Sequence, residues 1–403
     1  MKPTLFGYGL TTKAIARKLG GGCTFFDDNC KAPYTDDMGN RIHSSSMFEP
    51  DKSSLEITTP SLPPKHPLIQ QARNLMSEYD YFLSPKRPKP FTIWISGTNG
   101  KTTTTQMLTH LLKARGAVSG GNIGTPLADL DVDAPIWVLE TSSFTLHHTR
   151  IASPDIYLLL PITPDHLDWH GTPESYAADK LKPLETMREG ELALVPKGIE
   201  LPRTDAYVVE YDSDAFLCDY FGLESQKVAY RGAFLQDALL ALAVTKVLFD
   251  ETDYDLINRF ERDAHRQEEF TDAQGRLWVN DSKATNLDAT IQALKGYSDR
   301  PIHLILGGDD KGVDLTPLFE QMQPLMLTLY TIGTNSDRLL SLAKAYTIEA
   351  KEANTLDKAI GMIDKMHTLD SVALLSPAAA SFDQFDSYKH RGECFQDFVQ
   401  VLQ

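Results

Sequence analysis

Residues 97–103, Gly-Thr-Asn-Gly-Lys-Thr-Thr, combine glycines, a lysine and hydroxyl groups in an order that suits phosphate binding. The apolar run 91–96 before them predicts a buried strand, and the segment after them predicts an amphipathic helix. A glycine loop between strand and helix lets backbone N–H groups approach an anion, and the helix N-terminus adds partial positive charge. Lys101 can then reach the outer phosphates, and the Thr102 hydroxyl can hold Mg²⁺.

This loop departs from the standard phosphate-binding spacing, because Ile95 stands where that spacing has a glycine. The alternative is a glycine turn that caps an ordinary helix. That alternative leaves the pairing of Lys101 with Thr102 in the first helical turn unexplained. We therefore predict a bound nucleotide, held by Gly97, Thr98, Asn99, Gly100, Lys101, Thr102 and Thr103.

The composition of the whole chain bounds the class of protein. With 403 residues and 42% hydrophobic residues, the chain is long enough for several domains with sizeable cores. Its formal net charge of −16 disfavours a general nucleic-acid partner, whose binding surface is basic. The four cysteines show no CxxC spacing and are typical of reduced thiols. No long apolar run or signal peptide stands out, so we expect a cytoplasmic protein without membrane insertion.

Apolar segments alternate with helical ones along the chain, which predicts an α/β fold with parallel sheets. A short strand, a helix and a second strand are expected within residues 4–28, and a proline- and lysine-rich stretch at 84–90 indicates a linker. Further strands are expected at 91–96, 136–140, 155–161, 302–308, 327–333 and 372–377, with a long helix at 234–249. The predicted domains are 1–88, 89–262 and 263–403.

Three side chains of the middle domain are candidates for chemistry, and each has an ordinary alternative. Glu140 ends an expected strand, where a carboxylate can hold Mg²⁺ or merely cap a helix. His166 lies in a loop, where a histidine is more often structural. Lys180 lies on an expected helix, where a lysine usually belongs to a solvated face.

Polar turns follow strands in the other two domains as well. The turn at 7–12 partly matches a dinucleotide fingerprint, but its third glycine is missing, so the match is weak. In the last domain, the polar turns within 280–286, 306–312 and 374–385 each follow an expected strand. Each could be ordinary turn chemistry, but together they indicate one binding face at the carboxyl ends of the strands.

Taken in order, these motifs resemble those of the Mur ligases, ATP-dependent enzymes that form amide bonds in peptidoglycan precursor synthesis. The chain is similar to the members that add D-glutamate to UDP-N-acetylmuramoyl-L-alanine. The resemblance implies three α/β domains: a small Rossmann-like UDP-binding domain, a central P-loop ATPase domain and a C-terminal Rossmann-like domain that receives the amino acid. It covers nearly the whole chain, and its most specific segments are GTNGKTT, GGNIG (120–124), LETSSF, DHLDWHG, NDSKATN, LGGDDKG and SPAAASFDQF.

The resemblance also implies roles for individual residues. Lys101 would contact the β- and γ-phosphates of ATP. Thr102 with Glu140 would serve one Mg²⁺ ion, and His166 with Lys180 a second, Lys180 being carbamylated by CO₂. Further ATP contacts would be Arg266 and Asp281. The UDP-linked substrate would be held by Thr11, Thr12, Asn122, Ser143 and His166, and D-glutamate by Lys283, Thr285, Lys311, Ser381, Phe382 and Tyr388.

The chain departs from the family pattern at the adenine site. The family usually carries His-Asn-x-x-Asn at the start of a late helix of the central domain, where this chain has Ala233, Phe234 and Asp237. At these positions we expect Phe234 to supply an apolar contact to adenine and Asp237 a polar one. The predicted function has three alternatives: a sister Mur ligase, a folylpolyglutamate synthase and a nucleotide-binding switch without ligase activity. The polar turns of the last domain favour a ligase over a switch, and NDSKATN favours the D-glutamate-adding members. We expect a monomer that uses small-molecule substrates.

Overall fold

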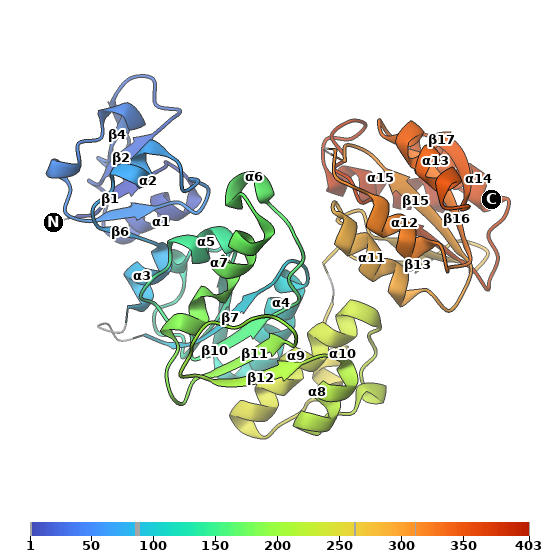
Figure 1. Ribbon diagram of the computed structural model, residues 1–403, viewed down its shortest axis with the longest axis horizontal. Coiled ribbons are helices and arrows are strands. Elements are labelled where there is room, and N and C mark those ends of the chain that lie inside the picture. Colours follow the sequence, from blue (N-terminus) through green and yellow to red (C-terminus); the bar gives the residue numbers. More distant parts are fainter. Residues whose placement is uncertain (1, 85–88, 262, 311, 403) are drawn as a thin grey trace. The chain divides into compact units, whose positions relative to one another are not determined.

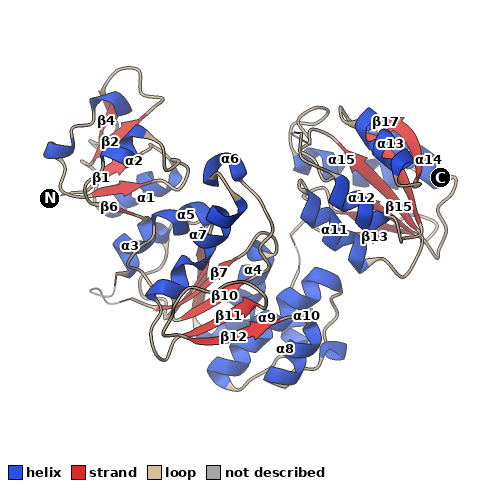
Figure 2. Cartoon of the chain, in the orientation of Figure 1, coloured by secondary structure: helices blue, strands red, loops and turns tan. Residues whose placement is uncertain are grey.

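The computed structural model describes residues 2–84, 89–261, 263–310 and 312–402, and it contains three six-stranded sheets with helices (Figures 1 and 2). Contacts between residues divide the chain into two compact units. The first comprises Met1–Ala229 with Asp237–Arg259, and the second comprises Tyr230–Gln236 with Phe260–Gln403. The α/β class expected from the sequence is confirmed. The expected domain limits at 88 and 262 fall on residues outside the described part and stay predictions.

The first sheet has the strand order β3-β4-β2-β1-β5-β6, in which β3 pairs antiparallel with β4 and the other pairs are parallel. Leu5, Phe25 and Ile57 of its central strands are fully buried and share one core with Ile15 of the first helix. Its elements are β1 (Thr4–Phe6), α1 (Leu10–Lys18), β2 (Thr24–Asp27), β3 (Tyr34–Thr35), β4 (Arg41–Ser44), β5 (Glu56–Thr58), α2 (Pro67–Gln71), β6 (Leu75–Met76) and α3 (Glu78–Leu83).

The second sheet is parallel throughout, with the order β12-β11-β10-β7-β9-β8. Its strands are β7 (Phe91–Ser96), β8 (Ala117–Gly121), β9 (Ile136–Glu140), β10 (Ile156–Leu159), β11 (Leu192–Pro196) and β12 (Tyr207–Tyr211). Its helices are α4 (Lys101–Leu112), α5 (Ser143–His148), α6 (Leu167–His170), α7 (Pro173–Thr186), α8 (Asp214–Phe221), α9 (Gly232–Phe249) and α10 (Tyr254–Asn258).

Strand β7 explains why the phosphate loop lies where it does. Ile93, Trp94 and Ile95 are fully buried, as expected for a parallel strand covered on both faces. In the sheet β7 lies between β10 and β9, whereas the next strand in sequence, β8, lies at the edge. The chain therefore leaves β7 where the direction of winding reverses, and ligands of open α/β sheets bind at such points.

Helix α9 is the helix that combines an apolar composition with a length of 18 residues in the described part of the chain, so by length and composition alone it could cross a membrane. The core helix of a soluble protein passes the same test. Residues 238–244 of α9 are completely buried. This burial accounts for an apolar character on every side of the helix.

The third sheet has the order β13-β14-β18-β15-β16-β17, with β13 antiparallel to β14 and the remaining pairs parallel. Its strands are β13 (Glu268–Thr271), β14 (Leu277–Asn280), β15 (Ile302–Gly307), β16 (Leu327–Ile332), β17 (Glu349–Asn354) and β18 (Val372–Leu375). Its helices are α11 (Leu287–Gly296), α12 (Thr316–Met322), α13 (Ser336–Ala345), α14 (Leu356–Asp364) and α15 (Tyr388–Gln400). The strands expected from residue 91 onward are confirmed, with ends that differ by no more than two residues, whereas the expected first strand is shorter and ends at Phe6.

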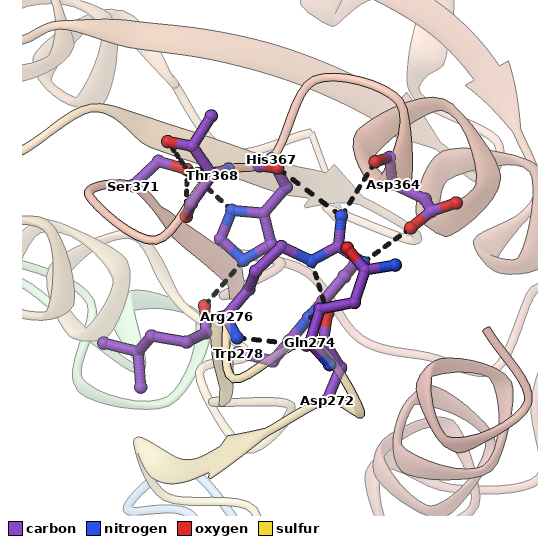
Figure 3. A network of polar contacts seen from close by, with 9 residues as sticks. Asp272, Gln274, Arg276, Trp278, Asp364, His367, Thr368 and Ser371 are labelled. Carbon is purple, nitrogen blue, oxygen red and sulfur yellow. Dashed lines mark hydrogen bonds and ion pairs between the residues drawn. The ribbon is translucent and has the colours of Figure 1, made fainter. Parts of the chain in front are cut away.

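A buried polar network joins the start of β14 to the end of α14 (Figure 3). Arg276 donates to Asp272 Oδ2 and to Asp364 Oδ1, both at 2.6 Å. The indole of Trp278 donates to the same Asp272 oxygen at 2.9 Å. The distance between His367 Nε2 and the carbonyl oxygen of Leu277 is 3.0 Å. The network lies at the amino end of β14, away from the polar turn that follows the strand.

Candidate active site

Two glycines give the phosphate loop its shape. Gly97 has a φ of 136° and Gly100 a φ of 83°, a region that side-chain-bearing residues rarely adopt. A Cβ on Gly97 would lie 2.5 Å from Leu160 Cβ, so any larger residue would clash. Lys101 begins α4, and its Nζ donates to the carbonyls of Gly97 and Thr98 at 2.9 and 2.6 Å. The lysine thus lies folded over the loop that it is predicted to serve.

The carboxyl group of Asp237 packs against this loop from α9. Its Oδ1 lies 3.0 Å from Thr104 Oγ1, and a Cβ on Gly100 would approach it to 2.7 Å. Asp237 is buried, and so are Thr103 and Thr104. Its contact with adenine stays a prediction. The structure adds a second role that the sequence did not indicate, which is to hold the turn at Gly100 and the first turn of α4.

Glu140 ends β9 as expected and is buried. Its Oε1 accepts a hydrogen bond from Asn122 Nδ2 at 2.6 Å. Its Oε2 has no hydrogen-bond partner among the described residues, although it too is buried. A buried carboxylate oxygen without a donor is an acceptor that a metal ion or its bound water can satisfy. Thr102, the residue predicted to share that ion, is half-buried in the first turn of α4.

Lys180 does not belong to a solvated face. It lies on α7, as expected, but only 1% of its surface is exposed. Its Nζ donates to the carbonyl of Gly97 at 2.7 Å and lies 4.7 Å from the centre of the Tyr176 ring. Burial, and then the positive charge of Lys101, lower the pKa of Lys180 well below its usual value. A lower pKa raises the fraction of the amine that is uncharged, and the uncharged amine is the form that can react with CO₂.

His166 and Ser143 belong to segments that pack against α7, the helix of Lys180. His166 precedes α6 in a left-handed conformation with a φ of 52°. Its half-exposed ring lies 4.8 Å from that of Phe144 and 6.4 Å from that of Tyr176, measured between ring centres. Ser143 begins α5, and its Oγ lies 3.0 Å from His170 Nε2.

Asp179 is a buried carboxylate next to Lys180 in the sequence, and sequence reasoning did not single it out. Its carboxylate accepts from His147 and from Lys182 at 2.8 Å, and it lies 2.9 Å from His170 Nδ1. Desolvation opposes its charge, but the bonds from His147 and Lys182 outweigh that effect and lower the pKa of Asp179. The sequence offers one weak indication of this cluster, since histidine, aspartate and lysine occur together in residues 170–182.

The turn after β1 is the predicted uridine site. Thr12 is fully buried, and its hydroxyl donates to the carbonyl of Gly7 at 2.6 Å. Thr12 therefore shapes the turn, while Thr11 beside it is partly exposed. Asp28 Oδ2 lies 2.9 Å from His66 Nε2. Direct contacts of Thr11 and Thr12 with the substrate stay predictions.

In the second unit, the polar turns expected to share a face do lie on neighbouring strands, β14, β18 and β15. Asp309 and Ala380 exchange two backbone hydrogen bonds, of 3.0 and 2.9 Å, which join the second turn to the third. Arg391 joins the first to the third. It is 1% exposed, and it donates to the carbonyls of Ser282 and Ala379 at 2.8 and 3.1 Å. Sequence reasoning missed this arginine because its position in α15 gives no hint of burial.

The predicted residues of this face fall into buried and exposed groups. Asp281 and Ser381 are buried, and Asp281 accepts from Ser376 Oγ at 2.7 Å. Lys283 Nζ lies 3.8 Å from Asp263 Oδ2 and 5.7 Å from the centre of the Tyr388 ring. Thr285 is exposed and Phe382 is 74% exposed. Arg266 Nε is buried without a hydrogen-bond partner among the described residues. Lys311 lies outside the described residues.

The sequence and the fold of this chain are similar to those of known proteins. Residues 95–212 match the Mur ligase middle domain. The chain is 48% identical over 405 residues to a UDP-N-acetylmuramoylalanine–D-glutamate ligase of Campylobacter jejuni, with 100% of both chains covered. It is 46% identical over 419 residues to the ligase of the same name from Helicobacter pylori, with 99% of each covered. Among solved structures, MurF from Acinetobacter baumannii shares the fold with a TM-score of 0.61 at 14% identity, over 98% of this chain and 89% of that one.

Proposed function

The chain belongs to the Mur ligases, and from this membership we propose that it is a MurD-type ligase. Such a ligase joins D-glutamate to UDP-N-acetylmuramoyl-L-alanine with ATP, in peptidoglycan precursor synthesis. The observation that carries the choice of substrates is the end-to-end similarity, 48% over the full length, to a ligase with that name. The phosphate loop, closed over by Lys101, supports the use of ATP.

The reaction requires one anion to attack another. The carboxylate of the UDP-linked substrate attacks the γ-phosphorus of ATP, ADP leaves, and an acyl phosphate forms. Catalysis of this step depends on positioning and on stabilisation of charge. Lys101 would turn from the carbonyls of Gly97 and Thr98 to the β- and γ-phosphates, while the backbone N–H groups of the loop hold the phosphate oxygens.

The oxygen ligands present fit Mg²⁺. This ion prefers oxygen and usually keeps water molecules and substrate phosphates among its ligands. A site formed by Thr102 and Glu140 fits this preference for oxygen ligands. Glu140 Oε2 is a buried acceptor that has no protein donor in the described part of the chain. His166 and Lys180 would form the second site. Across the described ranges no larger cluster of histidine, cysteine and acidic side chains suited to a metal is found. When bound, Mg²⁺ would offset the charge of the phosphates.

Lys180 becomes a suitable metal partner after carbamylation. Its uncharged amine would add to CO₂ and release one proton, which leaves an anionic carbamate on Nζ. The lowered pKa and the burial of Lys180 favour this reaction, because a protonated amine has no lone pair for the new bond. The carbamate would then supply oxygen atoms beside the loop, where a bare amine supplies none.

D-Glutamate would bind at the face formed by the polar turns of the second unit. Its amine attacks the acyl phosphate carbonyl, the amide bond forms and phosphate leaves. Cationic and hydroxyl side chains would hold its two carboxylates, and exclusion of water would protect the acyl phosphate from hydrolysis. The residues proposed for this site are Lys283, Thr285, Lys311, Ser381, Phe382 and Tyr388, and Arg266 and Asp281 are proposed to contact ATP.

The setting of the enzyme follows from the same proposal. Its partners are small molecules, and the net charge of −16 disfavours nucleic acid. We propose a cytoplasmic monomer that does not insert into a membrane, in which α9 serves as a core helix.

The test is release of phosphate from ATP in the presence of UDP-N-acetylmuramoyl-L-alanine, with D-glutamate, L-glutamate, L-lysine and L-alanine offered in turn. Release that requires both the UDP-linked substrate and D-glutamate is expected. A preference for another amino acid would identify a sister ligase. A rate of ATP hydrolysis that does not depend on the UDP-linked substrate would indicate a nucleotide switch or a different ligase such as folylpolyglutamate synthase.

A further inference from the structure

Ser143, His170 and Asp179 form a hydrogen-bonded chain that spans three helices. Ser143 is the first residue of α5, His170 the last of α6, and Asp179 lies within α7. His170 Nδ1 lies 2.9 Å from Asp179 Oδ2, and its Nε2 lies 3.0 Å from Ser143 Oγ. The imidazole is completely buried, so water does not compete for either bond.

Asp179 decides which nitrogen of His170 carries the proton. Its carboxylate also accepts from the Lys182 ammonium group and from His147, each at 2.8 Å. A carboxylate paired with an ammonium group offers acceptor atoms only, so Nδ1 of His170 must donate to it. In the neutral ring Nε2 is then a bare acceptor. The bond to Ser143 therefore runs in one direction, from the hydroxyl to the imidazole.

We propose that His170, oriented by Asp179, is a positioning residue that holds the Ser143 hydroxyl as a hydrogen-bond acceptor toward the UDP-linked substrate. Because the single O–H of Ser143 points to His170, only the lone pairs of its oxygen remain for a ligand. The substrate carries amide N–H groups in its N-acetyl and L-alanyl parts, and such donors match a fixed acceptor. This inference rests on the proposed function, in which Ser143 contacts that substrate.

The arrangement distinguishes this serine from an ordinary surface hydroxyl. A hydroxyl that rotates freely can donate or accept, and it therefore discriminates little between ligand groups. Here three residues from separate helices fix one orientation, and the same chain ties α5 to α7, the helix that carries Lys180. Second partners that set the tautomer of a histidine are a recurrent device for orienting a reactive or ligand-binding group.

The variant Asp179→Asn tests the direction of the bond. The asparagine amide can donate to Nδ1, which moves the histidine proton to Nε2 and forces Ser143 to accept from His170. We expect the KM for UDP-N-acetylmuramoyl-L-alanine to rise about 3- to 10-fold, as for the loss of one hydrogen bond, with the KM for ATP and D-glutamate little changed. Nitrogen NMR of histidine-labelled enzyme should show the proton of His170 on Nδ1 in the wild type and on Nε2 in the variant.

A double-mutant cycle with Ser143→Ala separates this role from a structural one. If Asp179 acts through Ser143, Asp179→Asn should change that KM no further in the Ser143→Ala background. Glu185→Gln, which makes the same carboxylate-to-amide change at an exposed position of α7, is the matched control and should leave the His170 tautomer and the KM unchanged. Equal effects of Asp179→Asn in both backgrounds, or a proton on Nε2 in the wild type, would overturn the proposal. A wild-type enzyme that releases no phosphate with D-glutamate would instead refute the proposed function.

Discussion

The burial of Lys180 and its lowered pKa lead to a direct test of the proposed carbamylation. If its buried amine carries a carbamate, Lys180→Ala should lose most of the phosphate-releasing activity, because one metal partner disappears. Acetate or formate should restore part of that activity by placing a carboxylate in the vacated space. Glu185→Ala, at an exposed position on the same helix, is the control and should retain activity. Near-full activity of Lys180→Ala would contradict the carbamylation.

Asp237 supports a second prediction about the phosphate loop. Its carboxyl group holds Thr104 and the turn at Gly100, so Asp237→Ala should loosen the phosphate loop. Loss of a buried hydrogen-bond partner costs about 1–2 kcal/mol, which corresponds to a rise in the KM for ATP of about 5- to 30-fold. Asp237→Asn keeps an oxygen acceptor for Thr104 and should stay close to the wild type. Steady-state kinetics with varied ATP measure both.

If the two Asp237 variants raise the KM for ATP equally, the carboxyl group itself is needed, and support of the loop is not its main role. The KM values for the UDP-linked substrate and D-glutamate are the internal controls. They should stay constant, since neither predicted site includes Asp237.

The sequence predicted site residues where chemistry and local order coincide, as in Lys101 directly after the glycine loop. It did not predict the burial of Lys180, because burial of a helical residue depends on which face of α7 packs against the loop after β7. It also missed Asp179 and Arg391. Their partners lie on other helices and strands, and no local pattern marks a long-range hydrogen bond.

The network around Arg276 joins the segment before β14 to the end of α14. Arg276→Met should destabilise the protein by about 3–5 kcal/mol, because it leaves the buried carboxylate of Asp272 without its cation. Arg300→Met removes an exposed ion pair with Asp299 and should cost less than about 1 kcal/mol. Thermal and chemical unfolding of both variants measure the difference.

Kinetics provide the control for this prediction. Arg276 lies at the amino end of β14, whereas the predicted D-glutamate residues follow the carboxyl ends of the strands. The folded Arg276→Met enzyme should therefore keep its KM values at a temperature where it remains native. A rise in the KM for D-glutamate would mean that the network also shapes the binding face.

Among the elements, buried parallel strands were the easiest to predict. Strands such as β7 and β15 are mostly apolar because both of their faces are buried. The short strands β3 and β6 escaped prediction, since two residues carry no periodicity. The order of strands also lay beyond the sequence, so the shared face of the polar turns was predicted without knowledge of which strands, β14, β18 and β15, are neighbours.

For the whole molecule, two buried groups predict opposite dependences of stability on pH. Burial lowers the pKa of His367 to about 4. The unfolded chain binds a proton near pH 6.5, so the contribution of His367 is complete above that pH and is lost as pH falls toward 4. Burial raises the pKa of Glu78 to about 8. Its contribution is complete below pH 4.5 and is lost as pH rises toward 8.

Variants make these opposite trends measurable. Relative to the wild type, His367→Gln should gain stability as pH falls from 6.5 to 4, and Glu78→Gln should gain stability as pH rises from 4.5 to 8. Melting temperatures of the three proteins across pH 4.5–8 provide the comparison. Parallel curves for a variant and the wild type would show that the group does not titrate differently on folding.

The carbonyl of Gly97 accepts from both Lys101 and Lys180. If Lys101 turns to the phosphates of ATP as proposed, the amine of Lys180 would lose a neighbouring positive charge and a competitor for this carbonyl. Carbamylation of Lys180 and binding of ATP would then alter each other's affinity by the same factor, as reciprocity of linked equilibria requires. The enzyme would in this way respond to dissolved carbon dioxide through its apparent demand for nucleotide.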